Sequence, residues 1–208
     1  MEHVVDENTT FLVRQHSFGG KGASKPKFTI ESLPGDECLE DKTDVLEKQP
    51  STATMSVDAK YVSVEDRHEF RDATGLPLFD LYHKTTSVTW LIEVPGGNGE
   101  PIAVITPHPS MFKDRLDVQV KNAADGGEEV MLHVEGQDIW KLRVNVYRGD
   151  EVVMTVKRTD KISPYLMSSK LSWVVDVASG MDVSLASAIV VVMAATLYSS
   201  STMSATWK

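Results

Sequence analysis

The sequence predicts an all-β fold, either a sandwich or a closed antiparallel barrel, with one buried helix near its C-terminal end. The first observation is a series of short strand-like segments separated by turn residues, from Phe11 to Val177, which is typical of sandwiches and barrels. The second is an uncharged stretch of sixteen residues, 183–198. A closed barrel leaves no strand edge exposed, and a late apolar helix suits its axis.

The strand-like segments are rich in β-branched or aromatic residues and are bounded by Gly, Pro, Asp or Asn, as β-strands usually are. The clearest hairpin has the turn Arg148-Gly149-Asp150, and Gly180 separates the last segment from the apolar stretch. The predicted strands cover residues 11–16, 27–31, 61–64, 68–71, 77–82, 87–94, 101–106, 116–120, 129–134, 141–147, 151–158 and 171–177.

The uncharged stretch 183–198 must be kept from water in a bilayer, between subunits or inside its own domain. A membrane-spanning helix needs about 20 apolar residues, whereas sixteen helical residues extend only roughly 24 Å. No Lys/Arg cluster flanks the stretch to set a membrane orientation. The β-branched segment Ile189–Val192 would suit a strand, but the stretch exceeds usual strand length and contains four alanines. We therefore favour a buried helix.

Three segments, in this order, resemble the LURP-one-related protein family. Residues 66–84 resemble its strand, Asp-x-x-Gly-x-Pro-Leu turn and following strand; residues 146–158 resemble a later hairpin; and residues 172–198 resemble its closing strand and C-terminal helix. The resemblance extends from about residue 11 to residue 198. It implies the architecture that this family shares with tubby C-terminal domains and phospholipid scramblases, a twelve-stranded antiparallel barrel around a hydrophobic helix.

We expect a single barrel domain over residues 11–198, with the central helix at 181–198. Residues 1–10 would form a flexible N-terminus, and residues 199–208 a Ser/Thr-rich tail. Residues 31–56 depart from the compact pattern of the family and are interpreted as an acidic loop insertion. A chain of 208 residues with 41% hydrophobic composition is long enough for one sizeable core.

The composition excludes several classes of function. A net charge of −9 argues against nucleic-acid binding, which relies on Lys and Arg neutralising phosphates. Cys38 is the only cysteine, so no intramolecular disulfide is possible. The sequence contains no His-Glu-x-x-His, Gly-x-Ser-x-Gly or phosphate-loop spacing. We therefore expect no enzymatic activity, no cofactor and no metal. We also expect a monomer, and a cytoplasmic location because no secretory signal is visible.

The predicted functional feature is a basic strand face. The period of two along residues 141–147 places the basic side chains opposite the apolar ones, and the hairpin register brings in the basic residues of the next strand. Such a cluster suits a phosphorylated head group, because Arg contacts phosphate bidentately and Lys supplies a point charge. Lys84 is added from the family resemblance. The predicted head-group site comprises Lys84, Lys141, Arg143, Lys157, Arg158 and Lys161.

Three functional hypotheses follow. The first is a peripheral membrane protein that binds phosphoinositide or another anionic lipid, as the resemblance to tubby domains implies for the class. The second is a regulatory module that binds a protein partner, in a stress or defence response as the LURP-one resemblance suggests. The third is a scramblase-like protein anchored in the membrane by the apolar stretch 183–198.

Overall fold

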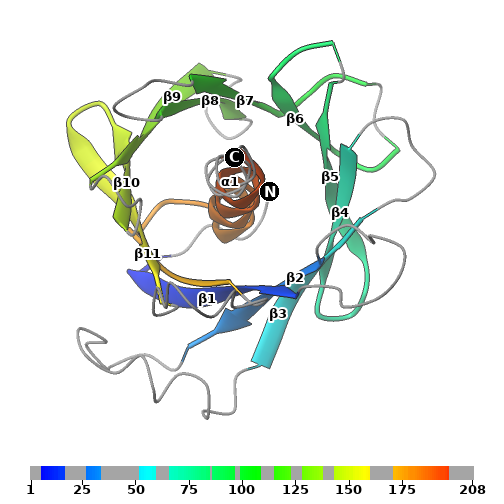
Figure 1. Ribbon diagram of the computed structural model, residues 1–208, viewed down its shortest axis with the longest axis horizontal. Coiled ribbons are helices and arrows are strands. Elements are labelled where there is room, and N and C mark those ends of the chain that lie inside the picture. The colour runs from blue at the N-terminus through cyan, green and yellow to red at the C-terminus, as the bar shows by residue number, and fades with distance from the viewer. Residues whose placement is uncertain are drawn as a thin grey trace, which may run out of the picture.

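The computed structural model describes residues 6–16, 27–33, 52–59, 66–84, 86–96, 99–108, 115–122, 128–137, 143–159 and 171–196. Within these residues lie twelve strands and one helix (Figure 1). The strands are β1 (Thr9–His16), β2 (Lys27–Ser32), β3 (Thr52–Ala59), β4 (Asp66–Asp72), β5 (Pro77–His83), β6 (Trp90–Glu93), β7 (Ala103–His108), β8 (Arg115–Asn122), β9 (Glu128–Gly136), β10 (Arg143–Arg148), β11 (Glu151–Arg158) and β12 (Ser172–Val177). The helix is α1 (Val183–Thr196).

The strands form a closed antiparallel barrel in which each strand pairs with its neighbours in sequence. Strand β1 closes the ring because it pairs with β2 on one side and with β12 on the other. The barrel is therefore confirmed over the sandwich. Alternation sorts the side chains, since successive residues of a strand point to opposite faces. On β10, Val144 and Val146 are buried inside, whereas Arg143 lies exposed on the outer face.

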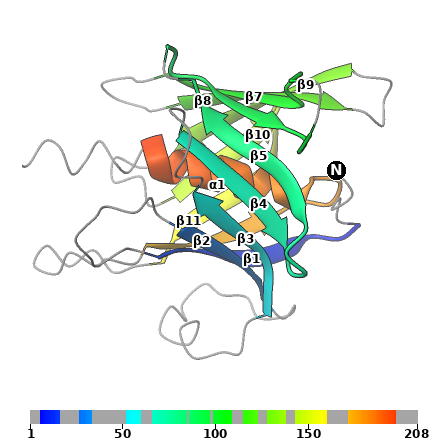
Figure 2. The same cartoon turned by 90° about the vertical axis from the view of Figure 1, so that its right-hand side faces the viewer.

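Helix α1 lies within the barrel, surrounded by the strands (Figures 1 and 2). All residues from Ser184 to Ala194 are buried, as expected for a helix that is apolar on every side. Asp182 caps its N-terminus: Oδ1 accepts hydrogen bonds from the amides of Ser184 at 2.7 Å and Leu185 at 3.1 Å. Ser187 donates its hydroxyl to the carbonyl of Val183 at 2.8 Å, so its burial costs little, whereas the buried hydroxyl of Ser184 has no hydrogen-bond partner among the described residues.

The predicted buried helix is thus confirmed over residues 183–196, and residues 197–198 lie outside the described part of the chain. Among the described residues, no helix is long and apolar enough to cross a bilayer. The scramblase-like hypothesis relied on this stretch as an anchor. That role is not open to Val183–Thr196 in this fold, because the barrel encloses the helix.

Strand β3 corrects the predicted organisation near the N-terminus. The sequence analysis extended a loop insertion from 31 to 56, but Thr52–Ala59 is a strand that pairs with β2 and β4. Its pattern of two is visible in the sequence: Met55 and Val57 are buried, and Thr54 and Ser56 between them are not. The acidic character of the preceding residues obscured this alternation. The predicted strand 61–64 and the rest of the insertion, 34–51, lie outside the described residues.

The Asp-x-x-Gly turn between β4 and β5 is a compact structural unit. Asp72 Oδ1 accepts hydrogen bonds from the amide and hydroxyl of Thr74 at 2.8 and 2.7 Å, and from the amide of Leu76 at 2.9 Å. Gly75 supplies the left-handed conformation, with φ of 89°. The hydrogen bond from the Thr74 hydroxyl lowers the pKa of Asp72 below its usual value. The backbone amides of the turn lower this pKa further, and desolvation opposes the shift.

Candidate functional site

The hairpin of β10 and β11 brings two of the predicted basic residues together. Arg143 lies directly opposite Lys157 in the antiparallel register, and both occupy the outer face because the buried Val144 and Val156 alternate with them. Side chains in such positions have Cβ atoms about 5 Å apart. Two cations therefore stand side by side on the surface of the barrel.

The other predicted residues are not part of this pair. Arg158 follows Lys157, so alternation turns it towards the inner side, opposite the fully buried Trp173 of β12. Lys84 is exposed just after β5, and β5 lies across the barrel from β11 (Figure 1). Lys141 and Lys161 lie outside the described residues. Of the six predicted positions, the structure thus brings only Arg143 and Lys157 side by side.

A polar network adjoins the cation pair on the same outer face. Thr155 donates a hydrogen bond to Asn145 Oδ1 at 3.4 Å. The hydroxyl oxygen of Tyr147 accepts hydrogen bonds from Asn145 at 3.3 Å and from Gln137 at 3.2 Å. Because the Tyr147 oxygen already accepts two N–H groups, its own proton is available to donate. This part of the barrel wall therefore presents donors beside two positive charges.

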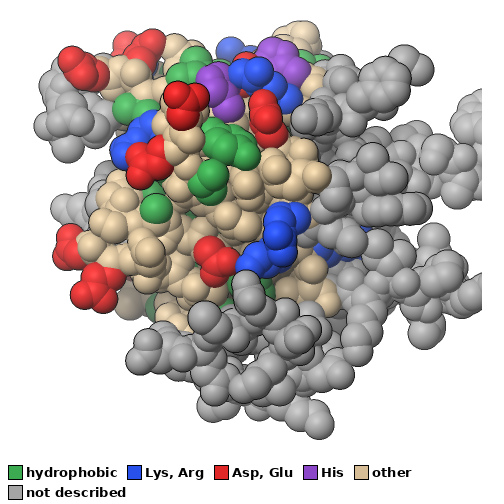
Figure 3. Space-filling model, turned by 90° about the vertical axis from the view of Figure 1, so that its left-hand side faces the viewer, with side chains coloured by type: hydrophobic (Ala, Val, Ile, Leu, Met, Phe, Trp, Pro, Cys, Tyr) green, Lys and Arg blue, Asp and Glu red, His purple; other side chains and the backbone are tan. Residues whose placement is uncertain are grey.

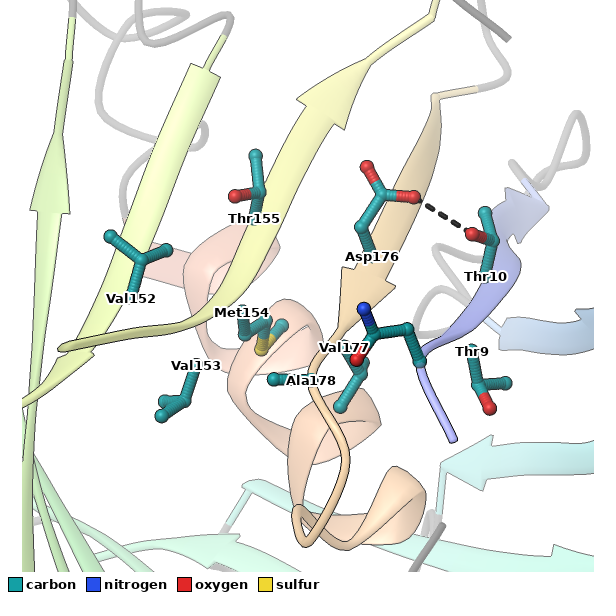
Figure 4. Close-up of a pocket in the computed structure, with 10 residues that line it drawn as sticks. Thr9, Thr10, Val152, Val153, Met154, Thr155, Asp176, Val177 and Ala178 are labelled. Atoms are coloured by element: carbon teal, nitrogen blue, oxygen red, sulfur yellow. Dashed lines mark hydrogen bonds between the residues drawn. The ribbon is translucent and has the colours of Figure 1, made fainter. Parts of the chain in front are cut away.

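Asp176 of β12 connects the cation pair to a pocket of about 350 Å³ over β11, β12 and β1 (Figure 4). Its Oδ2 lies 3.7 Å from the Lys157 ammonium, and its Oδ1 accepts a hydrogen bond from the Thr10 hydroxyl at 2.9 Å. The pocket is lined by Asn8, Thr9, Thr10, Val152, Val153, Met154, Thr155, Asp176, Val177 and Ala178. Hydroxyl, amide and carboxylate groups thus surround a partly apolar hollow.

A β-bulge shapes one wall of this pocket. The register of β10 against β11 shifts so that Val146 pairs with Met154 and Tyr147 with Val152. Val153 is the extra residue, and both Val153 and Met154 are buried while Val152 remains 43% exposed. An extra residue bends a strand and increases its local twist. We attribute the hollow beside β12 to this bend.

A second polar cluster on β7, β8 and β9 was missed by sequence reasoning. Asp117 Oδ2 lies 2.9 Å from His108 Nε2, and Asp117 Oδ1 lies 2.8 Å from His133 Nδ1 and 2.9 Å from Arg115 Nε. The register places Asp117 opposite His133, and Arg115 opposite His108. Only strand pairing unites these residues. Asp117 and His133 lie in segments that were predicted as strands, whereas His108 and Arg115 fall just outside the predicted bounds 101–106 and 116–120.

The charge state of Asp117 follows from this cluster. Partial burial tends to raise the pKa of the carboxyl, but hydrogen bonds from His133 and Arg115 and the charges of Arg115 and His108 outweigh that effect and lower the pKa below its usual value. The carboxylate is therefore ionised at any pH near neutrality. Within the described residues, no group of three or more His, Cys, Asp or Glu side chains is arranged to hold a metal ion.

Elsewhere on the outer surface, cations are held closely by acids. Arg67 lies 2.8 Å from Asp80 and stacks over the Tyr82 ring. Arg14 forms an ion pair with Glu31 at 3.0 Å. The ion pair of Lys157 with Asp176 is longer, at 3.7 Å. The ammonium of Lys157 is accordingly less tightly engaged than these guanidinium groups.

The sequence profile described as LURP-one-related matches residues 9–194, from the first residue of β1 into the last turn of α1. The chain belongs to the LURP-one-related family. The resemblance inferred from three short segments is thereby confirmed, and it extends over nearly the whole described barrel.

This LURP-one-related barrel also resembles a solved structure. An X-ray structure of a protein from Arabidopsis thaliana superimposes with a TM-score of 0.56 at 14% sequence identity, over 92% of this chain and 93% of the other. At that identity the similarity concerns the barrel fold alone and carries no residue roles. No curated protein sequence matches the chain.

Proposed function

We propose that this LURP-one-related domain is a non-enzymatic binding module that recognises a phosphorylated anionic head group, such as that of a phosphoinositide. The observation that carries the proposal is the direct pairing of Arg143 with Lys157 on the outer face. Like charges directly opposite one another destabilise a sheet. A bound phosphate would place negative charge between the two cations, so the pair suits an anionic ligand.

The chemistry of the two side chains is complementary. The Arg143 guanidinium offers a planar pair of donors that matches two phosphate oxygens, whereas the Lys157 ammonium supplies a compact charge. Lys157 lies 3.7 Å from Asp176, so an incoming phosphate competes with a long ion pair. Such exposed ion pairs contribute only about 0–1 kcal/mol to stability, so displacing Asp176 from Lys157 costs little free energy.

The neighbouring pocket supports a ligand larger than a phosphate ion. Thr10, Thr155 and Asp176 line it and offer groups that hydrogen-bond to the hydroxyls of a sugar or polyol ring. Asp176 lies between the pocket and Lys157. A head group whose phosphate rests on the cation pair would therefore direct its ring towards the pocket.

The test is sedimentation of purified protein with phosphatidylcholine vesicles that contain or lack phosphatidylinositol bisphosphate, near neutral pH. Wild-type protein should sediment only with the phosphoinositide vesicles. The double variant Arg143→Ala/Lys157→Ala should bind about 30-fold more weakly, since each basic side chain near an anionic surface contributes about 1 kcal/mol.

The matched control is Lys84→Ala/Lys121→Ala, which removes two exposed lysines, one just after β5 and one on β8, on other parts of the barrel. It should bind as wild type does. The proposal is wrong if the wild-type protein ignores both vesicle types, or if the control loses as much affinity as the Arg143/Lys157 variant. Wild-type binding by the control variant would also remove Lys84 from the head-group site.

A second candidate function is a module that binds a protein partner. It is supported by two exposed apolar side chains on this side of the barrel, Val152 at the pocket and Met131 on β9, each 43% exposed. Apolar side chains beside a polar rim are typical of protein interfaces. Met131→Gln, on β9 and outside the pocket lining, would weaken binding of a protein partner but not of phosphoinositide vesicles, and so separates the two functions.

A further inference from the structure

The cluster of His108, Arg115, Asp117 and His133 lies outside the site proposed above and contains chemistry that the proposed function does not use. Figure 3 shows histidine side chains gathered with basic and acidic ones on the side of the barrel formed by β9–β11 and the neighbouring strands. The side chains of His108 and His133 are 52% and 33% exposed. Both imidazoles are therefore accessible to a ligand.

The hydrogen bonds of His133 depend on whether its Nδ1 atom carries a proton. Its Nδ1 lies 2.6 Å from Arg115 Nη2 and 2.8 Å from Asp117 Oδ1. Arginine can only donate and a carboxylate can only accept, so Nδ1 satisfies one neighbour at a time. Without a proton, Nδ1 accepts from Arg115. With a proton, it donates to Asp117 and turns an N–H towards a guanidinium that can no longer remain at that distance.

Because the charges around the two imidazoles balance, a proton added to either one changes the net charge of this face. In the described parts of β7–β10, three positive and three negative side chains on the outer face cancel when the imidazoles are neutral. Each proton on an imidazole then adds one positive charge to a balanced surface. The titratable and charged groups on that face are His108 on β7, Arg115, Asp117 and Lys121 on β8, Glu129, His133 and Glu135 on β9, and Arg143 and Tyr147 on β10.

We propose that His108, Arg115 and His133 form a second anion-binding site, for a phosphate monoester group, which operates only when both imidazoles are protonated. Histidine is the side chain that changes charge between about pH 5 and 8. In the protonated state each imidazole keeps one N–H on Asp117 and presents the other to solvent. Arg115, displaced from His133, adds a bidentate donor.

Asp117 is the organising residue of this site and does not compete with its ligand. Partial burial opposes the ionised form, but the hydrogen bonds of His133 and Arg115 keep the pKa of Asp117 below its usual value. The carboxylate therefore stays charged where histidine protonates, and it holds both imidazoles in place by charge-assisted hydrogen bonds. The site uses none of the residues of the Arg143–Lys157 pair, so each proposal can fail without the other.

The experiment measures binding to phosphatidylcholine vesicles containing phosphatidic acid, a phosphomonoester lipid, at about pH 5.5 and about pH 7.5. Wild-type protein should bind about 5- to 10-fold more tightly at the lower pH, because two imidazoles add positive charge near an anionic surface while the phosphomonoester, whose second pKa is about 6, loses only part of its own charge. The variant His108→Gln/His133→Gln should lose this pH dependence. Arg115→Gln should weaken binding at the lower pH while leaving binding at the higher pH unchanged.

The matched control is His16→Gln. His16 is also on the outer face and bonded to a neighbouring side chain, Thr29, at 2.9 Å, but β10, β11 and β12 separate its strand from β9. It should retain the full pH dependence. The proposal is overturned if His16→Gln abolishes the effect, if the double variant keeps it, or if phosphatidylserine vesicles of equal charge bind as well as phosphatidic acid.

A soluble probe distinguishes the source of the phosphate. Glycerol phosphate is titrated into the full-length protein while the imidazole resonances of His108 and His133 are followed by NMR. Shifts at the lower pH that are absent in Arg115→Gln support a site for the phosphate group itself. Vesicle binding with the same pH dependence but no such shifts supports a site that requires a lipid surface. The absence of both results overturns the proposal.

Discussion

The interior of the barrel and its outer face between β7 and β11 are formed by the same strands, yet they respond to opposite physical demands. Inside, alternate residues such as Val144 and Val146 pack around a helix whose central residues are all buried. Outside, the intervening residues are ionisable or hydrogen-bonding, as at Arg143 and Asn145. Close packing leaves little freedom to change the side chains of the interior, whereas the side chains of the outer face can vary and can bind a ligand.

The same contrast appears in how polar groups are treated. The buried carboxylate of Asp182 has a fixed task, because Oδ1 caps helix α1 and is held by two amides. On the outer face, Asp117 is shared among three basic groups from three strands. Most buried polar groups keep a fixed hydrogen-bond partner, although Oδ2 of the same Asp182 is buried without one among the described residues. An exposed cluster can exchange partners with solvent, protons or a ligand.

The largest effect is expected from a charge placed on the helix. Ala188→Asp would put an unpaired carboxylate at a position with no solvent exposure, at a cost of several kcal/mol. That is comparable with the whole stability of a typical domain, so the protein should fail to fold, as judged by circular dichroism and solubility. Val152→Asp, at an exposed outer position, should leave the melting temperature nearly unchanged. Equal stability of both variants would contradict the buried-helix structure.

A smaller effect is expected from the helix cap. Asp182→Ala removes the acceptor of two amides and should lower the free energy of unfolding by about 1 kcal/mol. Asp182→Asn keeps an acceptor at the cap and should retain most of that stability. Denaturant titration of the three proteins measures the difference. If Asn is as damaging as Ala, the role of Asp182 is not capping.

The smallest effect is expected at the surface turn, and it depends on pH. The pKa of Asp72 is lowered in the folded state, chiefly by the Thr74 hydroxyl. A depressed folded pKa contributes stability that is fully present above the unfolded value of about 3.9 and is lost as the pH falls through the folded value. Wild-type protein should therefore melt above Asp72→Asn at neutral pH, and the two melting temperatures should converge in acid. A constant difference at every pH would exclude this linkage.

Most of the barrel was predictable because alternation is a local property of each strand. Residues 151–158 were predicted as a strand with the bounds that β11 has in the structure, and the helix was predicted from its lack of charge. Strand β3 was missed although Met55 and Val57 alternate with polar residues. Residues 52–56 had been assigned to the acidic insertion 31–56, and pairing with β2 and β4 makes the pattern plain.

The candidate sites were predictable only where one hairpin contains them. Arg143 and Lys157 belong to one hairpin, so their proximity was predicted from the sequence, whereas their direct pairing depends on the register shift at the β-bulge. Lys84 entered through family resemblance, and the structure places its strand across the barrel. His108, Asp117 and His133 come from three strands, and no spacing in the sequence indicates that they meet.

The sequence by itself determined the class of fold, the burial of residues 184–194 and the division of each strand into an apolar and a polar face. These properties depend on the spacing of apolar residues and on the absence of charge, and both can be read from residues that are neighbours in the sequence. Only the tertiary structure decided which strands place their polar faces next to one another. The register between strands and the closure of β1 on β12 bring Thr10 to Asp176 and His108 to Asp117, because strand pairing is set by packing of the whole core and not by any single segment.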